Sequence, residues 1–154
     1  MPIKSFQGER ATSSKKLNQN VLVKDIMTRN LVVFKKDQTI HEVMQKFIKH
    51  RISGGPVVDD AGNLIGVISE ADCMKEISDS RYFNLPILDR TVANFMSTEV
   101  DTIDANQTIF EAASQFFKSS RRRFPVLDNN RLVGQISRKD IVIATLNMKS
   151  QTWR

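Results

Sequence analysis

The sequence predicts an α/β (α+β) fold in which two β-α-β-β-α repeats pack together with pseudo-twofold symmetry. Three observations predict it: an internal duplication, apolar stripes at helical spacing in both copies, and short apolar runs bounded by turn residues. With 154 residues, of which 40% are hydrophobic and 26% charged, the chain is long enough to form a compact core.

The duplication aligns VKDIMTRNLVVFKKDQTIHEVMQKFI, which starts at Val23, with VANFMSTEVDTIDANQTIFEAASQFF, which starts at Val92. The register continues to Pro56 and Pro125, after which the second copy loses one residue at a predicted turn, where a repeat tolerates a deletion. We therefore expect a flexible basic tail (1–19), a first repeat (20–78), a connector (79–91), a second repeat (92–147) and a C-terminal tail (148–154).

Each copy begins with a short helical turn, around residues 25–27 in the first, and continues with an apolar run. The run from Leu31 to Phe34 is rich in β-branched residues and predicts a strand. Two stripes at i, i+3, i+4, i+7 and i+8 then predict helices with one buried face. The stripes are Ile40, Val43, Met44, Phe47 and Ile48, and Ile109, Ala112, Ala113, Phe116 and Phe117.

The starts of these helices carry capping signals. Thr39 is followed by Glu42, and Thr108 by Glu111, at the spacing of a capping box. Beyond each helix, two apolar runs flank a tight turn, at residues 60–63 in the first copy and 129–130 in the second, and predict paired strands. A further helix is expected to begin at Ser69 or its counterpart.

The junction between the last strand and the last helix is the candidate for chemistry. Ser69 and Ser137 stand there, each with an aspartate three residues later, Asp72 and Asp140. A helix start offers unpaired backbone amides and the positive end of the helix dipole, which suit a phosphate, and the carboxylate can accept hydrogen bonds from ribose hydroxyls. The alternative is an ordinary N-cap pair. One pair of residues can serve both purposes.

Two longer segments carry a family resemblance. The segment HRISGGPVVDDAGNLIGVISEADCMKEI and its echo SSRRRFPVLDNNRLVGQISRKDIVIATL resemble the core signature of cystathionine β-synthase (CBS) domains, over roughly residues 20–147. The resemblance implies a paired unit, or Bateman module, that senses adenosine-containing ligands in clefts between the repeats. AMP, ADP or ATP is the expected small-molecule ligand, and no further cofactor is expected. CBS pairs commonly associate through their helices, so we expect a homodimer that acts on an unknown regulated protein.

The resemblance also suggests which residues surround the ligand. Arg122 and Arg123 match the basic positions that often reach phosphates before the shared proline, although a solvated basic loop is the alternative. The first copy instead has Ser53, Gly54 and Gly55, which let a ligand or a backbone approach closely. The base is expected beside the first strand of a repeat, at Asn30, Leu31 and Val32 or at residues 99–101. Because the copies differ, we expect unequal sites.

Several other classes of function are not expected. No apolar stretch approaches the roughly 18 residues that span a bilayer, and a single cysteine agrees with a reducing compartment, so a cytoplasmic protein without membrane contact is expected. His41 and His50 have no partners at metal-ligand spacing, and no catalytic motif occurs, so neither a metal site nor an enzyme is expected.

The net charge of +6 favours anionic partners. Nucleic acid is not expected, because Phe6 and Phe124 are isolated among the basic residues and do not form a stacking platform. Two alternatives to ligand sensing stay open: a basic module that binds nucleic acid or an acidic protein, and a purely structural dimerisation unit.

Overall fold

The computed structural model describes residues 21–82 and 89–152, which form two compact units. Unit 1 contains residues 21–29, 102–128 and 133–152; unit 2 contains the described residues of 30–101 together with 129–132. The basic tail and residues 83–88 of the expected connector lie outside the described part.

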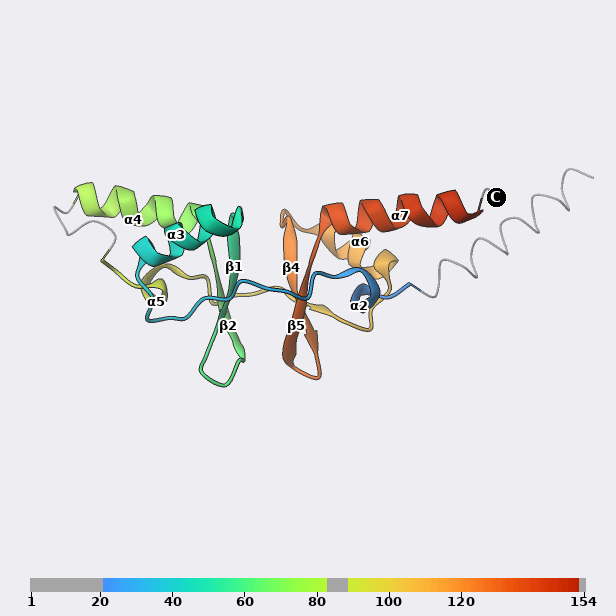
Figure 1. Ribbon diagram of the computed structural model, residues 1–154, viewed down its shortest axis with the longest axis horizontal. Helices are drawn as coiled ribbons and strands as arrows, with labels where there is room; N and C mark the ends of the chain where they lie inside the picture. Colours follow the sequence, from blue (N-terminus) through green and yellow to red (C-terminus); the bar gives the residue numbers. More distant parts are fainter. Residues whose placement is uncertain (1–20, 83–88, 153–154) are drawn as a thin grey trace, which may run out of the picture. The chain divides into compact units, whose positions relative to one another are not determined.

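Apart from the first strand of the first repeat, the helices and strands follow in the order that the duplication predicts (Figure 1). They are α2 (Val23–Ile26), α3 (Ile40–His50), β1 (Gly54–Val58), β2 (Leu64–Ser69), α4 (Glu70–Tyr82), α5 (Val92–Phe95), β3 (Ile103–Asp104), α6 (Ile109–Lys118), β4 (Arg123–Asp128), β5 (Arg131–Ser137) and α7 (Arg138–Thr152). Helix α4 continues into the range expected as connector, and α7 into the range expected as C-terminal tail.

Each unit is built on a small sheet. In unit 2, β1 and β2 are antiparallel, with Gly54 opposite Ser69 and Val57 opposite Gly66. In unit 1 the strand order is β3-β4-β5, and β3 runs parallel to β4 with Ile103 opposite Val126. The mixed α+β architecture is therefore confirmed.

The prediction of a strand from Leu31 to Phe34 is wrong for most of its length. Only Phe34 pairs with a neighbour: its N–H donates to Pro56 O at 2.9 Å, and its carbonyl accepts from Val58 N–H at 2.9 Å. Pairing stops there because the next amide, Lys35 N–H, donates to a side chain, Gln38 Oε1, at 2.8 Å. The β-branched run therefore signals partial burial rather than a ladder.

The predicted caps are present at the starts of α3 and α6. The Thr39 hydroxyl accepts from Glu42 N–H at 3.2 Å, and the Thr108 hydroxyl accepts from Glu111 N–H at 3.2 Å. These bonds satisfy one of the free amides in each first turn.

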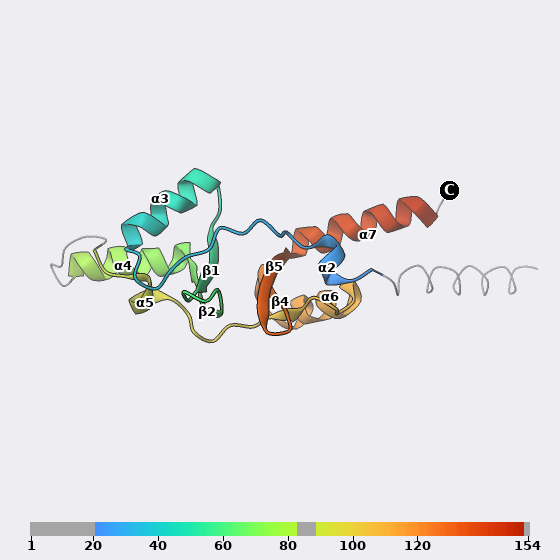
Figure 2. The same cartoon turned by 60° about the horizontal axis from the view of Figure 1, so that its bottom comes forward.

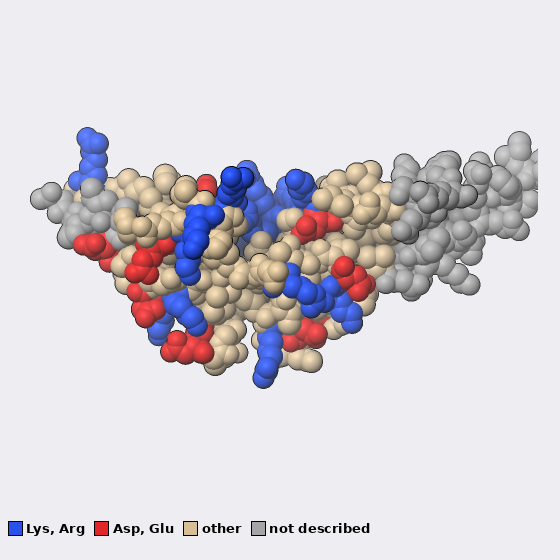
Figure 3. Space-filling view, viewed as in Figure 1, with Lys and Arg blue, Asp and Glu red and all other residues tan. Residues whose placement is uncertain are grey.

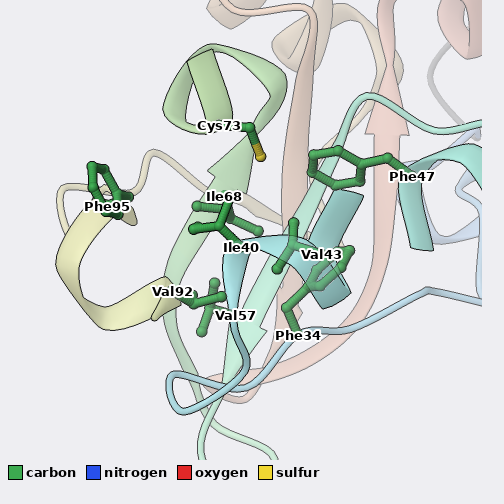
Figure 4. Packing of buried hydrophobic residues seen from close by; sticks show 9 residues of the cluster. All are labelled: Phe34, Ile40, Val43, Phe47, Val57, Ile68, Cys73, Val92 and Phe95. Atoms are coloured by element: carbon green, nitrogen blue, oxygen red, sulfur yellow. The ribbon is translucent and has the colours of Figure 1, made fainter. Parts of the chain in front are cut away.

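The apolar stripes are buried or half-buried at every position but the last. Ile48 is 82% exposed and its counterpart Phe117 is 91% exposed, contrary to the prediction. The i+8 position lies about 80° around the helix from position i, at the edge of the stripe, so it turns away from the sheet. The buried positions of α3 join the unit 2 core shown in Figure 4, which consists of Phe34, Ile40, Val43, Phe47, Val57, Ile68, Cys73, Val92 and Phe95.

The two units exchange the first segment of each sequence repeat. We call residues 21–28 and 90–97 the leading segments. The first, with α2, belongs to unit 1 and contacts α7, whereas the second, with α5, belongs to unit 2 and contacts α4 (Figures 1 and 2). The sequence repeats and the compact units therefore divide the chain differently.

The two docked leading segments use equivalent hydrogen bonds. Val23 N–H donates to Gln107 O at 2.9 Å, and Val92 N–H donates to Gln38 O at 2.9 Å. Each segment then ends in a short antiparallel bridge to the last strand of its unit, Thr28 to Gln135 in unit 1 and Ser97 to Val67 in unit 2.

Candidate ligand-binding site

In unit 2 the candidate corner lies where β2 passes directly into α4. Ser69 N–H donates to Asp72 Oδ2 at 2.8 Å, and the Ser69 hydroxyl donates to the same oxygen at 3.1 Å. Both residues are half-buried. The carboxylate is thus fixed across the first turn of the helix.

In unit 1 the equivalent corner, between β5 and α7, forms a reciprocal cap. Ser137 N–H donates to Asp140 Oδ2 at 2.8 Å, while Asp140 N–H donates to the Ser137 hydroxyl oxygen at 3.2 Å. This is the capping-box arrangement, in which serine and acid satisfy each other's amides.

The capping interpretation is therefore correct for the unit 1 corner, whereas in unit 2 the Ser69 hydroxyl donates to Asp72 instead of accepting from a helix amide; at neither corner is the whole carboxylate used. At both corners the bonds end on Oδ2, and within the described part of the chain no hydrogen bond reaches Oδ1 of Asp72 or Asp140. A carboxylate held by its own helix, with a second oxygen available, can accept a hydrogen bond from a ligand hydroxyl.

The expectation of bare amides needs one correction. The first amide of α4, Glu70 N–H, donates to Ser53 O at 3.0 Å, and the first amide of α7, Arg138 N–H, donates to Arg122 O at 3.2 Å. These bonds bring the residues before each proline, 53–55 and 122–124, to the corner of the same unit.

The two glycines before Pro56, Gly54 and Gly55, are needed by the protein's own packing. A Cβ at Gly54 would lie 2.9 Å from Ile68 O, and a Cβ at Gly55 would lie 2.7 Å from a ring carbon of Phe34 and 2.9 Å from Val32 O. The close approach expected at these glycines is made by Ile68 O at Gly54, and by the Phe34 ring and Val32 O at Gly55.

The residues expected beside a base belong to the same unit. Asn30 is exposed, and Leu31 and Val32 are half-buried in the irregular segment that leads to Phe34. Through Val32 O, this segment reaches Gly55 and the corner of unit 2.

In unit 1, Arg122 is exposed and Arg123 is half-buried. Sequence reasoning missed Arg138, whose guanidinium holds the loop before them: Nε donates to Arg121 O at 2.8 Å and Nη2 donates to Ser119 O at 3.3 Å. The available signal was a basic residue directly after the corner serine, where the first copy has Glu70.

The two corners consequently differ in local charge. The unit 2 corner carries Glu70 beside its aspartate, whereas the unit 1 corner carries Arg122, Arg138 and Lys139 beside its own. Elsewhere, on the face shown in Figure 3, basic and acidic side chains intermingle in both units.

Other reactive groups do not form a second site. Burial raises the pKa of the Cys73 thiol to about 11, with a smaller contribution from Asp72 and Glu70, so it stays protonated at neutral pH. His41 and His50 are exposed. Residues 21–82 and 89–152 contain no group of three or more His, Cys, Asp or Glu side chains arranged to hold a metal ion. The same residues include no helix that combines the length and apolar character of a bilayer span.

Comparison with known proteins gives a consistent picture. The CBS domain family matches residues 23–79 and 92–147. Protein MJ1426 of Methanocaldococcus jannaschii is 31% identical, covering 85% of this chain and 96% of its own. The crystal structure of CBSX2 of Arabidopsis thaliana in complex with AMP has a TM-score of 0.72 at 26% identity, covering 84% of this chain and 99% of that one.

A second solved structure holds other adenosine compounds. The CBS domain pair of protein MJ0100, in complex with 5′-methylthioadenosine and S-adenosyl-L-methionine, has a TM-score of 0.67 at 27% identity, covering 82% of this chain and 97% of that one.

Some curated relatives are much longer than this chain. The L-aspartate semialdehyde sulfurtransferase of Methanosarcina acetivorans is 30% identical over 86% of this chain, but the match covers only 25% of that enzyme.

Proposed function

Because this chain belongs to the CBS domain family, we propose that it is a regulatory module that binds adenosine-containing ligands at its Ser–Asp corners. The observation that carries the proposal is the pair of equivalent carboxylates, each fixed through Oδ2 and able to offer Oδ1 to a ribose hydroxyl. The AMP, methylthioadenosine and S-adenosylmethionine of the similar structures share that ribose.

The charge contrast supports a finer proposal for the ligand. Arg138 and Lys139 precede Asp140 in the first turn of α7, and Arg122 O accepts from Arg138 N–H; charged donors of this kind stabilise phosphate oxygens. We infer that the unit 1 corner binds the phosphate-bearing adenine nucleotides, AMP, ADP or ATP. The acidic unit 2 corner, with Glu70, is expected to bind them more weakly.

Isothermal titration with AMP, ADP, ATP and S-adenosylmethionine tests the proposal. We expect at least one of them to bind, and Asp140→Ala to weaken the nucleotides more than it weakens their 2′-deoxy counterparts, because only the ribose offers both hydroxyls. The absence of heat from all four at millimolar concentration would remove the sensing function. Equal losses for ribose and deoxyribose compounds would remove the role of the carboxylate.

The control must separate binding from capping, because Asp140 also holds the start of α7. Thr108→Ala removes a cap from α6 of the same unit without touching the corner, and should cost a similar ~1 kcal/mol of stability. A loss of affinity in both variants would show that the lower stability of unit 1, and not the missing carboxylate, weakens binding. A loss in Asp140→Ala alone supports direct contact.

We further propose that the module regulates rather than catalyses, acting on a partner protein or on its own self-association. Large apolar side chains on the helices of both units are exposed, which favours a homodimer. They are Ile48, Met74, Ile77, Tyr82, Phe110, Phe117, Val142, Ile143 and Leu146. Light scattering with and without AMP should report a dimer. A monomer that Ile48→Glu and Phe117→Glu leave unchanged would contradict self-association.

A further inference from the structure

An ion pair joins the second leading segment to α4. Glu76 is fully buried; its Oε1 accepts from the Ser80 hydroxyl at 2.8 Å, and within the described residues its Oε2 has no hydrogen-bond partner. Arg90 Nε lies 3.8 Å from that oxygen. The same guanidinium lies 3.8 Å from Asp79 Oδ2 and 4.6 Å from the centre of the Phe95 ring.

The corresponding positions of unit 1 carry no charge. In the register of the duplication, Glu76 corresponds to Ala144, and Arg90 corresponds to Val21. A buried acid and its cation in one unit therefore replace two apolar residues in the other.

Several of the other docking contacts are the same in both units, although the buried Phe95 corresponds to the smaller Ile26. The buried valines are identical, as are the methionines that pack against the glycines of β2 and β5, where a Cβ would lie 3.0 Å or less from the methionine sulfur. These pairs are Val23 and Val92, Met27 and Met96, and Gly134 and Gly66. Contacts that are alike cannot decide which leading segment packs on which unit.

We propose that the Glu76–Arg90 ion pair makes that decision. If each leading segment packed on its own repeat, Val21 would lie beside Glu76 and leave a buried carboxylate without a counter-charge. The Arg90 guanidinium would lie beside Ala144 with no acid. Removing the partner of a buried charge is strongly destabilising, so the unpaired Glu76 carboxylate disfavours the wrong packing even though the Arg90 side chain is itself 38% exposed.

One interaction favours the wrong packing, but it is weak. In unit 1, Lys24 Nζ donates to Asn106 Oδ1 at 3.2 Å in an exposed position. On its own repeat, Lys24 would lie near Asp37, the counterpart of Asn106, and would gain an exposed ion pair. Exposed pairs contribute little to stability compared with a buried one.

Disulfide trapping in the full-length chain distinguishes the two packings. With Cys73→Ala as the background, cysteines at residues 67 and 97 report the observed packing, because Val67 and Ser97 pair across an antiparallel bridge. Cysteines at residues 67 and 28 report the alternative, in which Thr28 would take the place of Ser97. Only the first pair should form an intramolecular disulfide when Glu76 and Arg90 are intact.

Moving the arginine from residue 90 to residue 21 should reverse which of the two disulfides forms. In Val21→Arg combined with Arg90→Val, the 28–67 disulfide should rise roughly tenfold or more while the 67–97 disulfide falls, since the cation now travels with the first leading segment. Adding Glu76→Ala and Ala144→Glu moves the acid to unit 1 as well and should restore the 67–97 disulfide.

Each result counts for or against the ion pair. An unchanged 67–97 disulfide in the arginine-transfer variant, with the 28–67 product at background, would show that the pair does not select the segment. If that variant fails to fold by circular dichroism, the fourfold variant decides. Recovery of folding and of the 67–97 disulfide supports the proposal, whereas failure of the fourfold variant overturns it.

Discussion

Replacing Gly55 with alanine tests whether the Phe34 ring leaves room for a side chain at residue 55. A Cβ at this position would lie 2.7 Å from a ring carbon of Phe34 and 2.9 Å from Val32 O. In unit 1 the counterpart of Gly55 is the buried Phe124, and the counterpart of Phe34 is the smaller Ile103. Unit 2 thus has its phenylalanine at residue 34 and a glycine at residue 55, whereas unit 1 has its phenylalanine at the position equivalent to residue 55.

The size of the effect follows from these distances. To reach ordinary contact the Phe34 ring would have to retreat by about 0.7 Å in a closely packed core, and overpacking of this kind costs about 1–3 kcal/mol. Phe34→Leu removes the obstructing ring atoms and should cost about 1–2 kcal/mol alone. The double variant should be destabilised by about 1 kcal/mol less than the sum of the two single variants. Part of the Gly55→Ala cost should remain, because the new Cβ still lies too close to Val32 O.

Urea denaturation followed by circular dichroism measures each free energy of unfolding. Gly62→Ala is the matched control: Gly62 has a φ of +85° and open space around its Cβ direction, so its cost of about 1 kcal/mol comes from the backbone alone. That cost should add to the cost of Phe34→Leu. Additive costs for Gly55→Ala and Phe34→Leu would refute the steric explanation.

Three further perturbations test local features. Thr39→Ala should destabilise the chain by about 1 kcal/mol through loss of the cap on α3, measured as a lower urea midpoint. The backbone amide of Asn63 lowers the pKa of Asp59 below its ordinary 3.8, so the stability that Asp59 contributes is present above 3.8 and is lost as pH falls through the lowered value. Asp59→Asn should therefore reduce the loss of unfolding free energy at acid pH. The buried Cys73 thiol, with its raised pKa, should react with a thiol reagent at neutral pH only as fast as the chain opens, and rapid reaction in native buffer would contradict its burial.

The repeated features of the fold could be predicted from sequence because they depend on local chemistry. The caps at Thr39 and Thr108 follow from residue types three positions apart, and the order of elements follows from the duplication. The corner residues were also found this way, since a serine that ends a strand and an acid in the next turn form a local pattern. Their role in ligand binding stays a proposal.

Features that depend on distant partners could not be predicted. The run from Leu31 to Phe34 has the composition of a strand, but only Phe34 finds a partner. The exchange of leading segments was hidden because both segments carry the same docking valine and methionine, so these two residues do not indicate their destinations. Two local signs of the difference were Glu76, where the second copy has Ala144, and Arg90, where the first copy has Val21.

The exchange of leading segments has a consequence for synthesis on the ribosome. Unit 2 cannot be finished until residues 90–97 have emerged, long after its hairpin, and unit 1 holds one of the earliest described helices, α2, against the last, α7. Closing such a distant contact is slow relative to local hairpins and helices. The nascent chain must therefore keep Val23 and its neighbours unburied until the residues of α7 have emerged.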